Sequence, residues 1–157
     1  MAASADQPTL VLLHGLLGDA NDWQPVQAAL AGLPSLALDL PGHGSNQAVR
    51  VTGFEQAHRW LCDELAARGI DRYQLVGYSL GGRLALYHAS QAPVGLQALL
   101  LENCHPGLPP AERPARLAHD EGWARRFEQE PLTAVLADWY RQGVFADLGE
   151  DARARQI

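Results

Sequence analysis

Residues 75–83 read Leu-Val-Gly-Tyr-Ser-Leu-Gly-Gly-Arg, with an apolar run at residues 73–76 before the serine and a segment of helical periodicity at residues 80–91 after it. A Gly-x-Ser-x-Gly sequence between a strand and a helix is typical of a nucleophile elbow, a sharp turn that lifts a serine hydroxyl above a sheet. The glycines on either side leave room where strand and helix pass closely. We therefore predict that Ser79 is catalytic, and that the helix N-terminus behind it favours a developing negative charge.

Arg83 follows Ser79 by one helical turn and is expected on the same helix face. Arginine can hold a carboxylate through two parallel hydrogen bonds, so a cation here suits an anionic substrate. The other interpretation is an ion pair with an acidic residue elsewhere in the structure. We favour the substrate, because an enzyme for neutral esters gains nothing from a cation at this position.

A second loop is predicted to join this site. The apolar strand at residues 9–13 ends at His-Gly-Leu-Leu-Gly, residues 14–18. The backbone N–H of Leu80, together with that of Leu16, would form an oxyanion hole. Both loops leave the carboxyl ends of strands, where α/β proteins bind ligands. The alternative for His14 and Gly15 is a simple turn with a packed histidine.

Apolar strands alternate with helical segments along the first two thirds of the chain. Strands are predicted at residues 9–13, 35–40, 73–76 and 96–101, and helices at 23–31, 54–68 and 80–91. Such alternation predicts an α/β fold, a mostly parallel sheet with helices on both faces. Several prolines follow, and then helical segments at 115–128 and 132–140 with no strand between them. We predict residues 1–106 as the core and 107–157 as an incomplete helical lid.

Composition and charge disfavour several kinds of binding partner and cellular location. The 157 residues carry a formal net charge of −6, with 12 arginines and no lysine, which disfavours nucleic acid and anionic membranes as partners. No apolar run has membrane-spanning length, and residues 1–8 lack signal-peptide features. Cys62 and Cys104 are predicted to be reduced core thiols in a cytoplasmic protein.

The histidines do not supply an obvious catalytic base. We predict His43 as a turn residue and place His58 and His88 on helices, facing outward or sideways. In elbow enzymes the acid and then the histidine follow on loops after later strands. Glu102 is a weak substitute for that acid, and otherwise a strand-end carboxylate. We therefore expect this chain to lack the acid, the base and the last strands, to be inactive alone, and to self-associate through an exposed sheet edge.

The motifs resemble a known superfamily. Residues 14–18 with Trp23, and residues 39–44, 77–83 and 102–108, resemble the α/β-hydrolase superfamily in order and spacing. Within it, residues 77–83, 105–108, 123–127, 130–132 and 138–145 resemble a family of lyases of bacterial menaquinone biosynthesis. The resemblance extends over residues 10–148.

This resemblance implies a carbon–oxygen lyase rather than a hydrolase. Such an enzyme removes a proton from a succinyl-enolpyruvyl-cyclohexene dicarboxylate and expels pyruvate, using no metal and no cofactor. The resemblance implies that Ser79 is the base. It also implies that several side chains hold the small anionic substrate, namely Tyr78, Arg83, Arg116, Trp139 and Tyr140. From the residues alone, Trp139 and Tyr140 are equally well explained by core packing.

Two other functions remain open at this point. One is a serine hydrolase acting on carboxylic esters or on C–C bonds, which would use the same elbow. The other is a non-catalytic fragment in which the elbow fold binds only a ligand or a partner chain.

Overall fold

A computed structural model describes residues 7–154, 156 and 157 of the chain. The chain forms two compact units, Met1–Pro106 and Gly107–Ile157.

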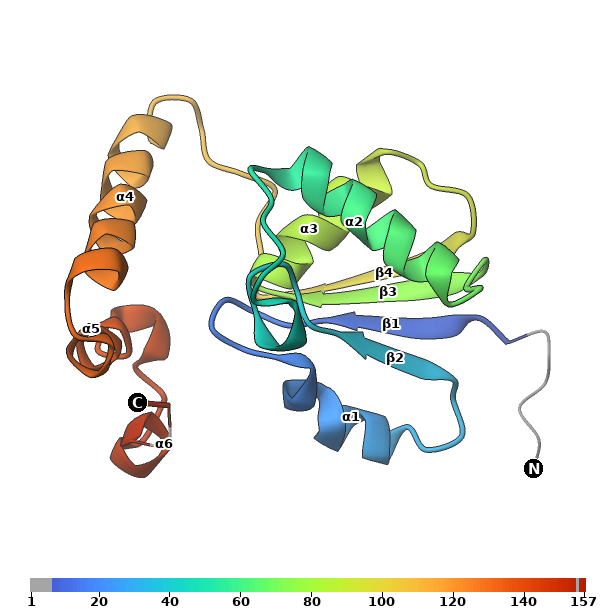
Figure 1. The fold of residues 1–157 in the computed structure, drawn as a ribbon, viewed down its shortest axis with the longest axis horizontal. Coiled ribbons are helices and arrows are strands. Elements are labelled where there is room, and N and C mark those ends of the chain that lie inside the picture. Colours follow the sequence, from blue (N-terminus) through green and yellow to red (C-terminus); the bar gives the residue numbers. More distant parts are fainter. Residues whose placement is uncertain (1–6, 155) are drawn as a thin grey trace. The chain divides into compact units, whose positions relative to one another are not determined.

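The first unit is built on a four-stranded sheet in which all neighbouring strands are parallel, in the order β2-β1-β3-β4 (Figure 1). The strands are β1 (Thr9–Leu13), β2 (Ser35–Leu38), β3 (Tyr73–Tyr78) and β4 (Leu96–Glu102). Leu13 of β1 is in register with Leu38 on one side and with Gly77 on the other. The carboxyl ends of these three strands therefore meet at one edge of the sheet.

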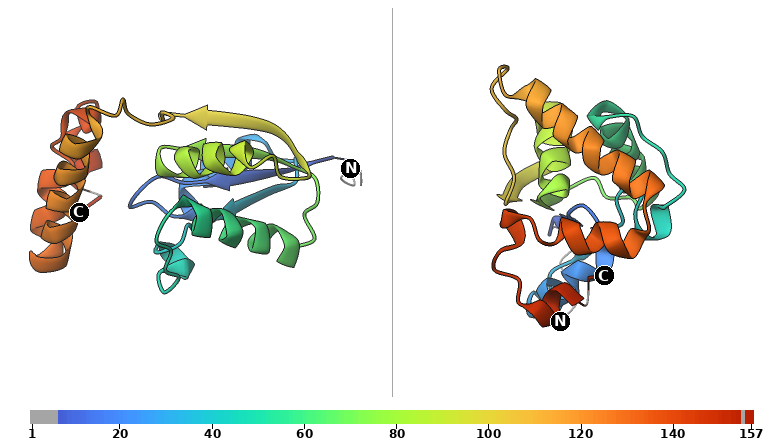
Figure 2. Two further views of the ribbon diagram at one scale, coloured as in Figure 1. Left: turned by 90° about the horizontal axis from the view of Figure 1, so that it is seen from above. Right: turned by 90° about the vertical axis from the view of Figure 1, so that its left-hand side faces the viewer.

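Helices cover both faces of this sheet, as predicted. The short helices η1 (Ala20–Trp23) and α1 (Gln24–Ala29) follow β1, whereas α2 (Phe54–Ala67) and α3 (Leu80–Ser90) lie on the opposite face (Figures 1 and 2). The chain moves from β1 outward to β2 and then crosses back to β3, so the direction of winding reverses between β1 and β3. Ligands of open α/β sheets bind at such a switch point. The α/β fold class is confirmed.

The main core lies between the sheet and the helices α2 and α3. Its fully buried members include Leu61 of α2 and Leu75 of β3, and Leu84 of α3 packs beside them. On α2 the buried residues Ala57, Trp60, Leu61 and Leu65 recur on one face of the helix. Burial of a leucine side chain stabilises the fold by about 1.5–3 kcal/mol. This packing fixes α3, and therefore Ser79, on the sheet.

One predicted strand is less buried than its sequence indicates. Residues 96–101 were expected in a buried strand, but Leu100 of β4 is 55% exposed and Leu101 37% exposed. Among the described residues β4 pairs only with β3, so it forms the end of the sheet. Its apolar sequence matches a central strand, and its position is that of an edge strand.

The second unit is helical. It contains α4 (Arg113–Gln129), α5 (Leu132–Trp139), η3 (Gly143–Phe145) and α6 (Glu150–Ala154). Most of α4 is exposed and polar, and ion pairs one turn apart, such as Arg116–Asp120, support it. Val135 and an aromatic cluster around Trp139 make the internal packing of this unit. No helix in the described part of the chain combines the length and apolar character needed to cross a membrane.

Candidate active site

Ser79 occupies a strained turn between β3 and α3, with φ 52° and ψ −112°. The neighbouring glycines are sterically required. A Cβ added at Gly77 would lie 2.5 Å from the Gly81 carbonyl oxygen, and one added at Gly81 would lie 2.4 Å from that of Leu13. A positive φ at a non-glycine residue costs of order 1–3 kcal/mol and is common at active sites. The residue is half-buried.

Two backbone N–H groups beside Ser79 are available to a ligand. Within the described residues, neither Leu16 nor Leu80 donates its N–H to a protein acceptor. The two loops that carry them are fastened together, because the Gly81 N–H donates to the His14 carbonyl at 3.0 Å. This arrangement is compatible with the predicted oxyanion hole, in which both groups would point at one developing charge.

His14 is a structural support for this loop. It is 1% exposed, its Nε2 accepts from the Leu40 N–H at 3.0 Å, and its Nδ1–H donates to the Gly15 carbonyl at 2.7 Å. Burial lowers the pKa of the imidazole. The packed-histidine interpretation of His14 therefore holds, and the same packing positions the loop that presents Leu16.

Asp39 organises the turn after β2. Its carboxylate accepts from the Ser45 hydroxyl at 2.7 Å, the Ser45 N–H at 2.8 Å and the Ala20 N–H at 2.7 Å. The hydrogen bond from the Ser45 hydroxyl is the main reason that the Asp39 pKa is lowered. In the same turn His43 accepts from the Leu17 N–H at 3.3 Å, as expected of a turn residue.

Arg83 lies on the first turn of α3 and carries its guanidinium over the ring of Phe54, 5.3 Å from the ring centroid. No acidic side chain among the described residues forms an ion pair with it. Phe54 also lines an apolar pocket of about 320 Å³, together with residues that include Leu40, Val51, Leu80 and Leu84. A half-buried cation thus lies beside an apolar pocket next to the elbow.

Tyr78 and Glu102 flank the elbow on the β4 side. Tyr78 is 38% exposed, and its hydroxyl accepts from the Asn103 amide at 3.4 Å. Glu102 contributes through its main chain, because its carbonyl accepts from the Ser79 N–H at 2.9 Å. That contact supports the strand-end interpretation of Glu102. Its use as a substitute acid stays a prediction.

Three predicted substrate-binding residues belong to the second unit, and their roles stay predictions. The Arg116 Nε donates to both carboxylate oxygens of Asp120, at 2.8 and 2.9 Å. Trp139 packs edge-on against Trp123 with ring centroids 4.9 Å apart, and Tyr140 is 8% exposed. Both aromatic residues therefore pack within their own unit. This packing does not test whether they also bind substrate.

The interpretation of His88 was wrong, and a cluster was missed with it. His88 is fully buried between α3, α2 and β3, where its ring contacts His58 and Tyr73. Burial lowers the His88 pKa to about 4. Cys62 and Cys104 are free, but both are half-buried rather than in the core. The sequence signal for the cluster of His58, Cys62 and His88 was the four-residue spacing of His58 and Cys62, which places them one helical turn apart on one face of α2.

Comparison with known proteins gives one consistent picture. The model of the α/β hydrolase fold family matches residues 8–150. A protein of Serratia proteamaculans named 2-succinyl-6-hydroxy-2,4-cyclohexadiene-1-carboxylate synthase is 53% identical over 146 residues, covering 92% of this chain and 57% of that protein. The synthase of the same name from Yersinia enterocolitica is 52% identical over 152 residues, covering 96% of this chain and 56% of that protein.

Solved structures agree with the sequence relatives. The structure of MenH from S. aureus superposes with a TM-score of 0.85 at 25% identity, covering 99% of this chain and 62% of that one. A hydrolase from Pseudomonas aeruginosa gives a TM-score of 0.76 at 23% identity, which is a likeness of fold. The chain spans less than two thirds of the length of each of these relatives.

Proposed function

We propose that this chain, which belongs to the α/β-hydrolase fold family, carries the serine elbow of a lyase of menaquinone biosynthesis. The reaction would eliminate pyruvate from a succinyl-enolpyruvyl-cyclohexene dicarboxylate. The names of the bacterial relatives at 53% and 52% identity support this reaction. The free thiols of Cys62 and Cys104 are compatible with a reducing, cytoplasmic location.

In this proposal Ser79 acts as a base rather than as a nucleophile. Another base first takes the proton of the Ser79 hydroxyl, and the resulting serine oxyanion removes a proton from the carbon next to the succinyl carbonyl. The electrons of the broken C–H bond move into the conjugated system, and the C–O bond between the ring and the enolpyruvyl group breaks. The leaving group departs as the enolate of pyruvate, which takes up a proton to give pyruvate. The negative charge that develops on the carbonyl oxygen would be held by the N–H groups of Leu16 and Leu80. No metal or cofactor is required for this sequence of steps.

Arg83 is the observation that carries the proposal. Its guanidinium is half-buried one helical turn from Ser79 and has no acidic partner among the described residues. A half-buried arginine without an acidic partner can bind a ligand carboxylate through two hydrogen bonds, so the position suits an anionic ligand. The substrate carboxylates of the proposed reaction would supply that charge. Tyr78 would contact the substrate from the neighbouring position.

We also propose substrate-binding roles for three residues of the second unit. We propose that Arg116 holds another substrate carboxylate, for which it would exchange the Asp120 carboxylate that it binds in this structure. Trp139 and Tyr140 would close over the ring of the substrate. The closure of a helical lid excludes water and positions reacting groups, which is its usual contribution to catalysis.

A serine hydrolase is the second candidate, favoured by one observation, the strained Ser79 elbow itself. The two functions differ in what they release. A hydrolase would free p-nitrophenol from p-nitrophenyl esters, whereas the proposed lyase would release pyruvate only from the dicarboxylate intermediate. A chain that binds the anionic substrate but does neither would be the non-catalytic fragment.

The decisive experiment measures pyruvate release from the dicarboxylate intermediate. This chain and the full-length synthase of Serratia proteamaculans, to which it is similar, would be assayed in parallel. We expect turnover only in a protein that also carries the catalytic acid and histidine, and Ser79→Ala in that protein should lower it by about 10³-fold or more, the size of loss typical of removing a catalytic serine. Ester hydrolysis without pyruvate release would assign the hydrolase. Turnover that survives Ser79→Ala would remove Ser79 from the chemistry.

A further inference from the structure

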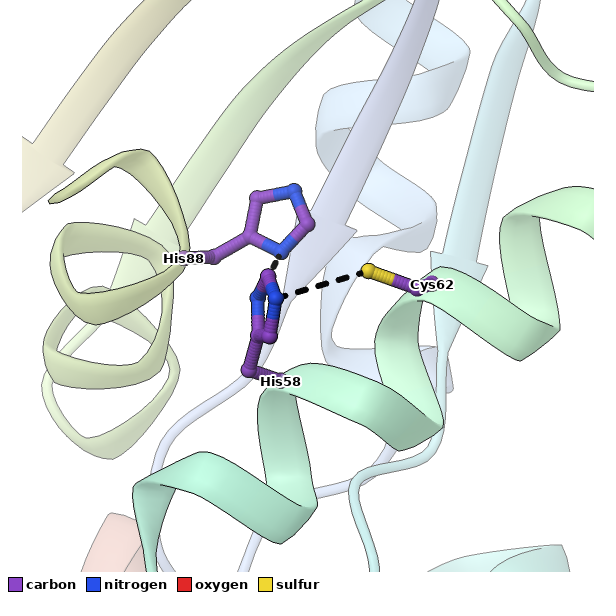
Figure 3. Close-up of side chains that lie close together, drawn as sticks. All are labelled: His58, Cys62 and His88. Atoms are coloured by element: carbon purple, nitrogen blue, oxygen red, sulfur yellow. Dashed lines mark hydrogen bonds between the residues drawn. The ribbon is translucent and has the colours of Figure 1, made fainter. Parts of the chain in front are cut away.

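A group of metal-ligating side chains lies between α2 and α3, apart from the elbow (Figure 3). His58 and Cys62 project from successive turns of α2, and His88 projects from α3 to meet them. The Nδ1 atoms of His58 and His88 are 2.9 Å apart, and the Cys62 Sγ is 3.7 Å from the His58 Nε2. One ligand atom from each residue can be chosen so that all three lie within 4.8 Å of one another.

We propose that His58, Cys62 and His88 bind a zinc-class divalent cation. Two imidazoles and one thiolate form a donor set that suits Zn²⁺, which is commonly bound by Cys and His in tetrahedral geometry. Zn–N and Zn–S bonds of about 2.0–2.3 Å place neighbouring ligand atoms roughly 3.3–3.8 Å apart. To reach that range, the Nδ1 atoms of His58 and His88, now 2.9 Å apart, must separate slightly, and any pair near the 4.8 Å limit of the cluster must close by about 1 Å.

The surroundings of His88 are those of a metal ligand. Its Nε2 is hydrogen-bonded to the Tyr73 hydroxyl at 2.6 Å, and both side chains are buried. That bond fixes the ring so that Nδ1 faces His58. Histidines that bind metals usually make such a hydrogen bond with the other ring nitrogen, because it sets the tautomer and the ring orientation.

An open coordination position would face a pocket. A pocket of about 510 Å³ is lined by His58, Cys62 and Tyr73, so water or a small ligand can reach the cluster. His88 lies on α3, and Ser79 is the residue immediately before that helix. At a rise of about 1.5 Å per residue, the helix separates His88 from Ser79 by roughly 13–14 Å along its axis. The proposed metal is therefore not part of the serine chemistry.

The alternative is a hydrogen-bonded chain without a metal, running from Tyr73 through His88 and His58 to Cys62. A cobalt titration of the tag-free chain distinguishes the two. Bound Co²⁺ in place of Zn²⁺ should give intense visible bands typical of tetrahedral geometry and a near-ultraviolet charge-transfer band from the thiolate. Added Zn²⁺ should abolish both. A spectrum that shows neither band, or visible bands without the thiolate band, would overturn the proposal.

Three variants make the assignment specific. Cys62→Ser should abolish the thiolate band and weaken Zn²⁺ binding by about 100-fold or more, and His58→Gln should weaken binding similarly. Cys104→Ser, which changes the other free cysteine, should bind as the unmodified chain does. Zn²⁺ should also slow alkylation of Cys62 but not of Cys104. Retention of the thiolate band by Cys62→Ser, or its loss in Cys104→Ser, would refute the site.

Discussion

The backbone N–H of Leu40 donates a 3.0 Å hydrogen bond to Nε2 of His14. This contact ties the loop after β1 to the end of β2 at the same sheet edge where Ser79 lies. Because Nε2 must be unprotonated to accept this bond, the folded structure selects the neutral imidazole. A proton on His14 would remove the bond and leave a charge in a residue that is 1% exposed.

Stability should therefore depend on the protonation of His14. Burial lowers its pKa in the folded state below the ordinary value of 6.5. Below about pH 6.5 the unfolded chain binds a proton that the folded chain excludes, so the free energy of unfolding falls as the pH is lowered. Urea unfolding at several pH values between neutral and mildly acidic should show a steeper loss for the natural chain than for His14→Gln. Equal pH dependence in the two would contradict this role.

The elbow was predictable because its signals are local. Gly77, Ser79 and Gly81 are required by the turn itself, so the motif specifies a backbone geometry that the structure confirms. The parallel sheet and its helices followed from the alternation of apolar strands and amphipathic helices. The exposure of Leu100 was not predictable, because a strand's sequence does not state whether a neighbour lies on both sides.

The His58–Cys62–His88 cluster is a second feature that the sequence could not predict. His58 and Cys62 share one helix, and their spacing places them on one face. His88 lies 30 residues further along the chain than His58, and it joins them only because α2 and α3 pack side by side. Nothing in the local sequence of α3 distinguishes a buried histidine from an outward one. Tertiary packing decided its position.

Replacing an elbow glycine by alanine should destabilise the fold, whereas the same substitution at a glycine in an exposed helix should not. Alanine at Gly81 would place its Cβ 2.4 Å from the Leu13 carbonyl oxygen, so Gly81→Ala should destabilise the first unit by about 1–3 kcal/mol or more. Gly122 in α4 has open space around it, so Gly122→Ala should stabilise α4 by about 0.5–1 kcal/mol. Hydrogen exchange, followed separately in α3 and α4, measures both effects. Similar effects of the two substitutions would disprove the steric argument.

Arg83 should control substrate affinity. A charge-assisted hydrogen bond contributes about 1.5–3 kcal/mol, which corresponds to roughly 10–150-fold in binding. In a protein that carries this elbow and releases pyruvate, we expect Arg83→Gln to raise the KM by an amount in that range, and Arg83→Lys to recover part of it. Arg59→Gln is the control, because Arg59 is exposed and pairs with Glu55 on the surface of α2. An unchanged KM in Arg83→Gln would show that the guanidinium does not bind substrate.

Self-association of this chain should involve β4. Among the described residues this strand pairs only with β3, and an unpaired strand edge is a template for pairing with another chain. Leu100 is 55% exposed on this strand. A lysine at such an edge position opposes pairing, so Leu100→Lys should reduce the fraction of associated species in sedimentation velocity. Leu117→Lys makes the same change of charge at a residue of α4 that is 60% exposed, and it should leave association unchanged. A natural chain that stays monomeric and monodisperse at high concentration would contradict the prediction, as would equal effects of the two lysines.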